Sequence, residues 1–298
     1  MFPNFLPSQV NQLTDPKAIA FGQSIQRIAL VTSLSQYPIL TTYICKGSGG
    51  TPILLLHGFD SSILEFRFLL PLLAAQNETW AVDLLGFGFT QRQKEITYSP
   101  TTIRIHLYDF WKTLINRPIV LVGASMGGAT AIDFTLAYPQ VVKSLVLVNS
   151  LGYTCAPTFI KYLFPPFDFC AVEYLRQRHI LALKLASTLP NFNAKILLAI
   201  QCAMLHQEMS GWNDAMISYV KTGGYSDLAN RIVKVDKPTL ILWGEADDML
   251  PLEDADKFQQ SIANSQLIKL KNCGHAPQLE QPLITSQHIL QFLNNWDF

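Results

Sequence analysis

The sequence predicts an α/β protein with a doubly wound, mostly parallel β-sheet and a helical insertion. Short apolar runs alternate with amphipathic, helix-like stretches through most of the 298 residues, as in chains that place helices on both faces of a sheet. Several of the runs, such as ILLL, IVLV and TLILW, are continuously apolar. Such runs are typical of parallel strands that are covered on both faces.

The elements of the sheet layers follow in chain order. The first two strand-like runs have no helix between them, so they predict an antiparallel start to the sheet. We expect strands at residues 24–33, 38–46, 52–56, 79–82, 118–122, 144–148, 239–243 and 266–270. We expect the covering helices at residues 62–75, 100–115, 126–138, 253–262 and 282–293.

Residues 151–235 interrupt this alternation, because they carry no convincing buried strand. Their helical patterns lie near 170–187, 192–208 and 211–221, and an aromatic stretch, TFIKYLFPPFDFC, precedes them. Open α/β sheets bind ligands at the carboxyl ends of their strands. We therefore interpret this segment as a helical cap over that edge, and residues 1–150 and 236–298 as the core domain.

Composition and charge exclude several classes of protein. The chain has 22 basic and 22 acidic side chains and a net charge of zero, whereas nucleic-acid binding normally needs a basic face. Its five cysteines are widely spaced, with no CxxC pair, which argues against a disulfide framework or a zinc site and indicates a reducing compartment. The chain start has no secretory pattern and no apolar run is long enough to span a membrane, so we expect a cytoplasmic protein.

A nucleophile candidate follows the strand PIVLV, where Gly123-Ala124-Ser125-Met126-Gly127 leads into a helical run. This is the pattern G-x-S-x-G between a strand and a helix. It places the serine on a sharp, strained turn, so that its hydroxyl projects from the edge of the sheet. Small residues two positions before and after the serine let the strand and the helix approach closely.

A base and an orienting carboxylate follow in the chain order Ser, acid, His that this kind of site requires. Asp247 lies in an acidic turn after the strand TLILW, where its neighbour Asp248 competes for the role. His275 lies in a loop just past the next strand. The residues after the strand SLVLV are Asn149 and Ser150, so no carboxylate is available one strand earlier.

Two backbone N–H groups are candidates for an oxyanion hole. Phe59 belongs to the loop after the strand PILLL, and Met126 follows the serine directly. We expect His57 to support this loop and not to transfer protons. The turn that begins at Asp83 lacks the third glycine of a dinucleotide motif, so we interpret Asp83 as structural.

With these residues assembled, the sequence resembles the α/β-hydrolase superfamily over nearly its whole length. The runs Trp243-Gly244-Glu245-Ala246-Asp247 and Gly274-His275-Ala276-Pro277 are similar to the acid turn and the histidine loop of that family. The resemblance assigns the carboxylate to Asp247 and not to Asp248. A serine at position 125 argues against the branches of the family whose nucleophile is an aspartate, the epoxide hydrolases and haloalkane dehalogenases.

Three further stretches look like chlorophyll dephytylase and its cyanobacterial relatives, which are serine esterases that cleave the phytol ester of chlorophyll. They are HGFDSSILEFRFLLPLL, ETWAVDLLGFGFT and TGGYSDL. The residues beside the serine depart from the plant members of that group. The resemblance implies ester hydrolysis and names phytyl esters as a candidate substrate class.

The sequence therefore predicts a serine esterase with Ser125 as nucleophile, His275 as base and Asp247 as its orienting acid. We expect no metal, no organic cofactor and no nucleic-acid partner. In the cap, Phe164 and Phe167 belong to an aromatic cluster that would be either an ordinary cap core or a contact surface for an apolar ester. An apolar cap edge can also rest on a bilayer, which leaves peripheral contact with a membrane, such as a thylakoid, open.

Other functions use the same residues. A C–C bond hydrolase or a cofactor-free peroxidase would need the same serine, histidine and aspartate with a different pocket. A ligand receptor on this fold would retain the three residues and turn over slowly. The oligomeric state is not predicted by the sequence.

Overall fold

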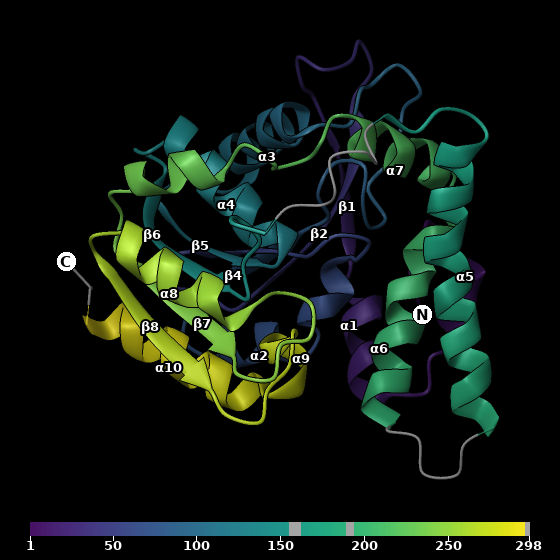
Figure 1. The fold of residues 1–298 in the computed structure, drawn as a ribbon. Helices are drawn as coiled ribbons and strands as arrows, with labels where there is room; N and C mark the ends of the chain where they lie inside the picture. Colours follow the sequence, from purple (N-terminus) through teal and green to yellow (C-terminus); the bar gives the residue numbers. More distant parts are fainter. Residues whose placement is uncertain (155–161, 189–193, 296–298) are drawn as a thin grey trace.

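The computed structural model describes residues 1–154, 162–188 and 194–295 (Figure 1). The described residues form an eight-stranded sheet in the order β1-β2-β4-β3-β5-β6-β7-β8. Strand β2 pairs antiparallel with β1 and β4, and the pairings from β4 to β8 are parallel. The strands are β1 Gln26–Leu30, β2 Ile39–Lys46, β3 Ile53–Leu56, β4 Thr79–Val82, β5 Ile119–Ala124, β6 Val142–Val148, β7 Thr239–Gly244 and β8 Ser265–Leu270. The predicted sheet is confirmed.

Helices cover both faces of this sheet, because successive side chains of a strand point to opposite faces. In β3, Leu54 and Leu56 pack into one core, while Ile53 and Leu55 pack into the other. The first core is closed by α3 Pro100–Leu114, α4 Met126–Ala137 and α8 Leu252–Ser261, and the second by α1 Pro16–Gln23, α2 Leu69–Leu73 and α10 Pro282–Asn295. Strands β3, β5 and β7 are buried at every position, which explains why their sequences are almost continuously apolar.

Two differences between the observed and the predicted helices lie in the first part of the chain. The predicted helix 62–75 is divided into a 3₁₀ turn, η2 Ile63–Phe66, and the short helix α2. Pro71 has no N–H group and its ring clashes with the carbonyl one turn earlier, so a continuous helix is excluded there. Helix α1, whose start is capped by Asp15 accepting from the Ala18 N–H at 2.7 Å, was not predicted, because its eight residues are too few to show a helical period.

The chain between β6 and β7 forms helices and no strand in its described part. It comprises α5 Phe167–Thr188, α6 Ala194–Leu205, η4 His206–Glu208, α7 Trp212–Lys221 and η5 Ala229–Lys234. Figure 1 shows α5 and α6 side by side, beyond the edge of the sheet at which α1 lies. Phe159 and residues 192–193, which the sequence places in the cap, lie outside the described residues. None of the helices that the structure describes is long and apolar enough to cross a membrane.

Candidate active site

Ser125 lies between β5 and α4 with φ 52° and ψ −119°, a backbone conformation that non-glycine residues rarely adopt. The two neighbouring glycines explain how the turn fits. A Cβ on Gly123 would lie 2.2 Å from the Gly127 carbonyl oxygen, and one on Gly127 would lie 2.0 Å from the Leu56 carbonyl oxygen. The close approach inferred from the sequence is therefore present, and it depends on both glycines.

His275 is paired with Asp247. Its Nδ1 atom lies 3.0 Å from Oδ1 and 2.9 Å from Oδ2 of the carboxylate. Because an ionised carboxylate only accepts hydrogen bonds, Nδ1 carries the hydrogen and Nε2 is left as the basic nitrogen. Asp248 is exposed and makes no such contact among the described residues, so the structure distinguishes the two acids of this turn.

The Asp247 carboxylate is held by several donors. Its Oδ1 accepts the Met249 N–H at 2.8 Å and the Leu250 N–H at 3.0 Å, and its Oδ2 accepts from the Asn149 amide in a short contact. Burial opposes ionisation, but the hydrogen bonds from His275, Asn149 and the backbone outweigh it and lower the pKa of Asp247. In the sequence, Asn149 indicates only that no carboxylate follows the strand SLVLV. Its position at the end of β6, beside the end of β7, could have indicated that it supports Asp247.

Ser125 and His275 line the same pocket. Of the hydrogen bonds among residues 1–154, 162–188 and 194–295, none joins the Ser125 hydroxyl to His275. Hydrogen bonds of this kind are often long in ligand-free sites and tighten when substrate binds. The structure thus pairs the acid with the base and brings the serine to the same cavity.

The two predicted oxyanion donors border this pocket as well. Neither the Phe59 N–H nor the Met126 N–H donates to an acceptor within the described part of the chain. A Cβ added to Gly58 would lie 3.4 Å from the Ser125 Cβ, so the loop passes directly beside the serine. Two unpaired donors beside a nucleophile are what an oxyanion hole requires.

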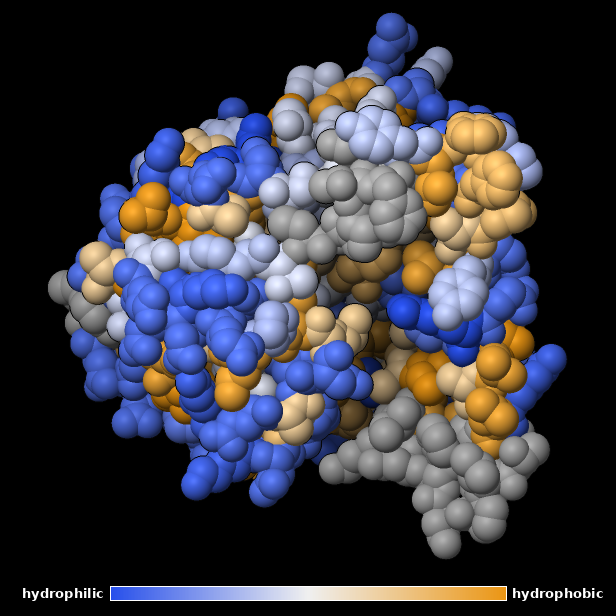
Figure 2. Space-filling model, viewed as in Figure 1, coloured by the Kyte–Doolittle hydropathy of each residue, from blue (hydrophilic) through white to orange (hydrophobic). Residues whose placement is uncertain are grey.

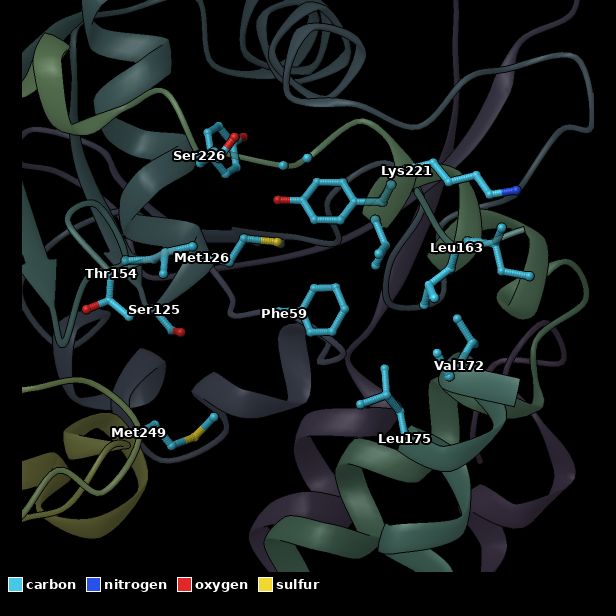
Figure 3. Close-up of a pocket in the computed structure, with 18 of the residues that line it drawn as sticks. Phe59, Ser125, Met126, Thr154, Leu163, Val172, Leu175, Lys221, Ser226 and Met249 are labelled. Carbon is cyan, nitrogen blue, oxygen red and sulfur yellow. The ribbon is translucent and has the colours of Figure 1, made fainter. Parts of the chain in front are cut away.

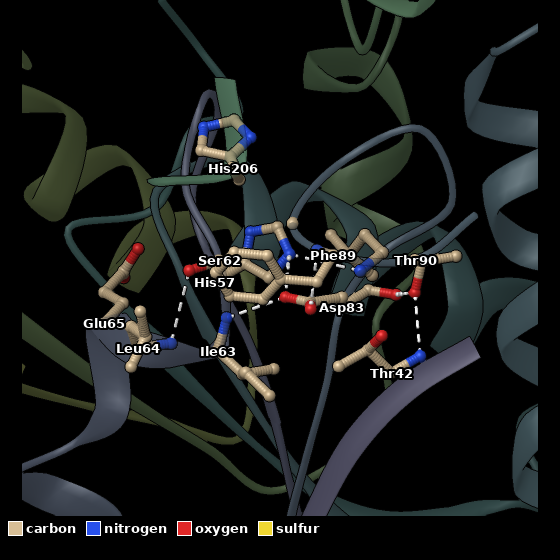
Figure 4. A network of polar contacts seen from close by, with 12 residues as sticks. Thr42, His57, Ser62, Ile63, Leu64, Glu65, Asp83, Phe89, Thr90 and His206 are labelled. Atoms are coloured by element: carbon tan, nitrogen blue, oxygen red, sulfur yellow. Dashed lines mark hydrogen bonds and ion pairs between the residues drawn. The ribbon is translucent and has the colours of Figure 1, made fainter. Parts of the chain in front are cut away.

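A buried polar network holds the base of the oxyanion loop (Figure 4). His57 Nδ1 lies 2.8 Å from the Gly58 carbonyl, and His57 Nε2 accepts the Leu84 N–H at 3.1 Å. Complete burial lowers the pKa of His57 to about 3, so the ring is neutral and structural. Asp83 accepts the Ile63 and Phe89 N–H groups, each at 2.8 Å, and burial raises its pKa to about 7. The structural roles expected for both residues agree with these contacts.

Glu65 links the oxyanion loop to the histidine loop, and no motif in the sequence indicates this role. One carboxylate oxygen accepts the Gly58 N–H at 3.1 Å, and the other accepts from the Gln278 amide at 2.7 Å. Burial raises the pKa of Glu65. A second acid, Glu280, accepts the N–H groups of the residues on either side of His275, Gly274 at 2.7 Å and Ala276 at 3.0 Å. No sequence spacing connects position 65 with position 278, so only the fold reveals the first link.

The pocket has a volume of about 590 Å³, within the usual range for small-molecule sites. Apolar side chains dominate its wall (Figure 3); they include Phe59, Met126, Leu163, Val172, Leu175 and Met249. At one end an ion pair joins Lys221 to Asp168 at 2.6 Å. Among the described residues, no group of three or more His, Cys, Asp or Glu side chains could hold a metal ion.

Phe164 and Phe167, which the sequence offers as contacts for the substrate, do not line this pocket. Their side chains are 65% and 56% exposed, and their rings pack against each other at 5.4 Å. The residues of α5 that line the pocket are Asp168, Ala171, Val172, Tyr174 and Leu175. With 3.6 residues per turn, these positions share one broad face of the helix.

Comparison with known proteins agrees with this fold. A model of the alpha/beta hydrolase family matches residues 53–285. The chain therefore belongs to the alpha/beta hydrolase family, as its sheet order and the strained serine turn after β5 indicate.

Three curated relatives cover most of this chain. The chain is 33% identical to alpha/beta hydrolase domain-containing protein VTE7 of Arabidopsis thaliana, over 99% of this chain and 90% of that protein. It is 30% identical to the 2-hydroxy-6-oxo-6-(2'-aminophenyl)hexa-2,4-dienoic acid hydrolase of Metapseudomonas resinovorans, over 85% and 87% of the two chains. It is 29% identical to monoacylglycerol lipase ABHD6 of Homo sapiens, over 81% and 74%. The relatives thus include hydrolases of more than one substrate class.

Proposed function

We propose that this protein is a serine esterase in which Ser125 is the nucleophile, His275 the base and Asp247 its orienting acid. The observation that carries the proposal is the pairing of His275 Nδ1 with Asp247. This pairing leaves Nε2 as the basic nitrogen of a ring that borders the same pocket as Ser125. Phe59 and Met126 are the proposed oxyanion donors.

The reaction would proceed in two halves. Ser125 Oγ attacks the ester carbonyl carbon while His275 Nε2 takes the hydroxyl proton, and the carbonyl oxygen becomes an oxyanion. When the C–O bond to the alcohol breaks, His275 returns the proton to the leaving alkoxide. A water molecule then attacks the acyl-enzyme with His275 again acting as base, which releases the acid and restores Ser125.

The substrate we propose is an ester with a long apolar group. The wall of the pocket is largely apolar, so burial of hydrocarbon would supply much of the binding free energy. The relative that is a monoacylglycerol lipase acts on an ester of this kind. Within this class, the phytol ester of chlorophyll is the specific candidate, because the stretches at 57–73, 78–90 and 222–228 resemble chlorophyll dephytylases.

Such an ester resides in membranes, and we propose that the outer side of the insertion contacts a lipid surface. Tyr162, Phe164, Phe167 and Phe169 are exposed beside Leu163, which lines the pocket. Figure 2 shows apolar surface over α5 and α6, next to the hollow in the middle of the molecule. Co-sedimentation with phosphatidylglycerol vesicles tests this contact: the double variant Phe164→Ser/Phe167→Ser should bind several-fold less.

Labelling with a fluorophosphonate tests the esterase itself. We expect one adduct, at Ser125, which forms in the wild type and is absent from Ser125→Ala. Competition by phytyl, long-chain and short-chain esters, chlorophyll among them, would then rank the substrates. Folded wild-type protein that forms no adduct would contradict the proposal, and protection by short esters alone would contradict the apolar substrate class.

A second candidate is hydrolysis of a C–C bond. The Metapseudomonas relative acts on a dienoic acid that contains no ester, so its hydrolysis must break a carbon–carbon bond. Turnover of a ring-cleavage dienone together with failure on all p-nitrophenyl esters would favour this candidate. The apolar pocket favours the ester.

A further inference from the structure

Asp60 follows the proposed oxyanion residue Phe59 and its carboxylate is turned toward the insertion. The residue is buried and has φ 50°, in the left-handed region that non-glycine residues avoid. A strained, buried acid in a loop persists only where the surrounding structure holds it. The contacts of its carboxylate show what holds it.

Side chains from three elements of the insertion converge on Asp60. Gln207 donates to Oδ2 at 3.0 Å and the Trp212 indole N–H donates to Oδ1 at 3.2 Å. His206 Nε2 lies 3.1 Å from Oδ1, and His179 Nδ1 lies 4.0 Å from Oδ2 and 3.1 Å from the Gln207 amide. Gln207 and His206 belong to η4, Trp212 to α7 and His179 to α5. One carboxylate of the core domain therefore accepts hydrogen bonds from Gln207 and Trp212 and lies beside two imidazole rings.

The neighbouring residue contacts the insertion too. The Phe59 ring packs against Tyr219 of α7 at 5.9 Å and against Phe87 at 5.7 Å. Phe59 and Asp60 thus anchor one short piece of backbone to the insertion, one by an aromatic contact and the other by hydrogen bonds. The N–H of Phe59 is part of that piece, and it has no acceptor among the residues that the structure describes.

We propose that Asp60 is a positioning residue: through it the insertion holds the oxyanion loop so that the Phe59 N–H points at the reacting carbonyl. This inference rests on the proposed esterase function. Because Tyr219 and Leu175 line the pocket on the insertion side, a substrate that moves the insertion would also move this donor. Filling of the apolar pocket and stabilisation of the oxyanion are therefore coupled.

The test compares Asp60→Asn with Asp133→Asn. Asp133 is also a buried acid, but it lies on α4 and binds Arg104 at 2.8 Å and Arg231 at 2.7 Å. Losing an oxyanion donor lowers kcat by about 100- to 1,000-fold. We expect misplacement of one donor in Asp60→Asn to lower kcat on p-nitrophenyl acetate by about 10- to 100-fold, with KM changed less than about threefold. Asp133→Asn should stay within about twofold of the wild type.

An inhibitor that forms a tetrahedral adduct separates positioning from loss of folding. A trifluoromethyl ketone becomes an oxyanion when Ser125 adds to it, so its affinity should fall in parallel with kcat in Asp60→Asn. Trp212→Phe removes one donor to Asp60 and keeps the aromatic packing. It should lower kcat several-fold in the wild type and have almost no further effect in Asp60→Asn, because contacting residues are not additive.

The outcomes distinguish this inference from the function on which it rests. If wild-type Ser125 takes no fluorophosphonate adduct, the esterase itself is wrong. If the wild type is labelled and hydrolyses esters while Asp60→Asn retains kcat and inhibitor affinity, the positioning role is overturned. Equal losses of kcat in Asp60→Asn and Asp133→Asn, each accompanied by a lower Tm, would overturn it as well.

Discussion

Asn149 donates a hydrogen bond to the same carboxylate oxygen of Asp247 that lies 2.9 Å from His275 Nδ1. The side-chain oxygen of Asn149, Oδ1, in turn accepts the Gly244 N–H at 3.1 Å, which ties the end of β6 to the end of β7. The orientation of the Asp247 carboxylate, the proposed partner of the base, thus depends on two neighbouring strands, and this supports the first prediction.

Asp247→Asn should lower kcat on esters by about 10⁴-fold, because the amide no longer selects the tautomer with hydrogen on Nδ1. Asn149 lies beside this carboxylate, so adding Asn149→Asp to Asp247→Asn should return about 10-fold or more of the lost kcat. Asn149→Asp alone is the control and should lower kcat, since two adjacent carboxylates repel. Steady-state kinetics on p-nitrophenyl butyrate give kcat for the two single variants and the double variant. A double variant whose kcat does not exceed that of Asp247→Asn would show that a carboxylate at position 149 cannot replace the one at position 247.

Glu65→Leu should leave the Gly58 N–H and the Gln278 amide without an acceptor. We expect it to lower the free energy of unfolding by about 1–3 kcal/mol and kcat by about tenfold or more, because one oxyanion loop contact is lost. Glu65→Gln is the matched control. It can still accept from Gly58 and, after rotation of the Gln278 amide, donate to that side chain, so kcat should stay within about threefold. Equal kinetics for the two variants would remove the positioning role of Glu65.

Gly127→Ala should destabilise the protein by about 3 kcal/mol or more, because the new Cβ would lie 2.0 Å from the Leu56 carbonyl oxygen. Gly49→Ala is the comparison: nothing lies within 4 Å of its added Cβ, and its φ is +76°. Gly49→Ala should lower the free energy of unfolding by only about 1–2 kcal/mol, because it introduces backbone strain and no steric clash. Urea unfolding measures the free energy of unfolding of both variants. Similar decreases in the two would show that the backbone around Ser125 can shift to relieve the clash.

His106 should make the protein less stable in acid. Burial lowers its pKa to about 3 from 6.5, so as pH falls below 6.5 the unfolded chain takes up the proton first. The contribution of the neutral His106 ring to the stability of the folded state is fully present above pH 6.5 and is lost as the pH falls toward 3. Between pH 7 and pH 5 this one imidazole should reduce the free energy of unfolding by about 2 kcal/mol. The side chain in His106→Gln does not titrate, so between pH 7 and pH 5 the free energy of unfolding of this variant should fall by about 2 kcal/mol less than that of the wild type. An equal fall in the two proteins would contradict the prediction.

Leu175→Trp should narrow the pocket, which Leu175 lines from α5. We expect kcat/KM on a long-chain p-nitrophenyl ester to fall about tenfold, a change of about 1.4 kcal/mol, while p-nitrophenyl acetate is hydrolysed within about twofold of the wild-type rate. Leu181→Trp makes the same change on the same helix, at an exposed side chain, and should affect neither ester. A loss on both esters in Leu175→Trp would argue that the pocket does not select chain length.

The strand pattern could be predicted because it is local. The eight strands, the antiparallel start and the serine turn after β5 follow from runs of apolar residues and from two glycines. The prediction of one helix over 62–75 was wrong because Pro71 cannot continue a helix from the turn before it, and α1 was missed because a helix of eight residues shows little periodic signal.

The rest of the site depends on contacts between distant parts of the chain. The order Ser, acid, His and the choice of Asp247 could be inferred from motifs. The bonds that join Glu65 to Gln278, or Asp60 to Trp212, could not, because no spacing relates such residues. The aromatic stretch before α5 illustrates the same limit, since composition cannot tell which side of a helix faces a pocket.

By itself, then, the amino-acid sequence determined the layered α/β sheet and the order in which the reactive side chains leave its edge, since burial and turn chemistry act between near neighbours. The tertiary structure decided which face of α5 lines the cavity, what holds the Asp247 carboxylate and what supports the oxyanion loop. These depend on where the insertion packs, and packing is set by shape and by hydrogen-bond partners from remote segments.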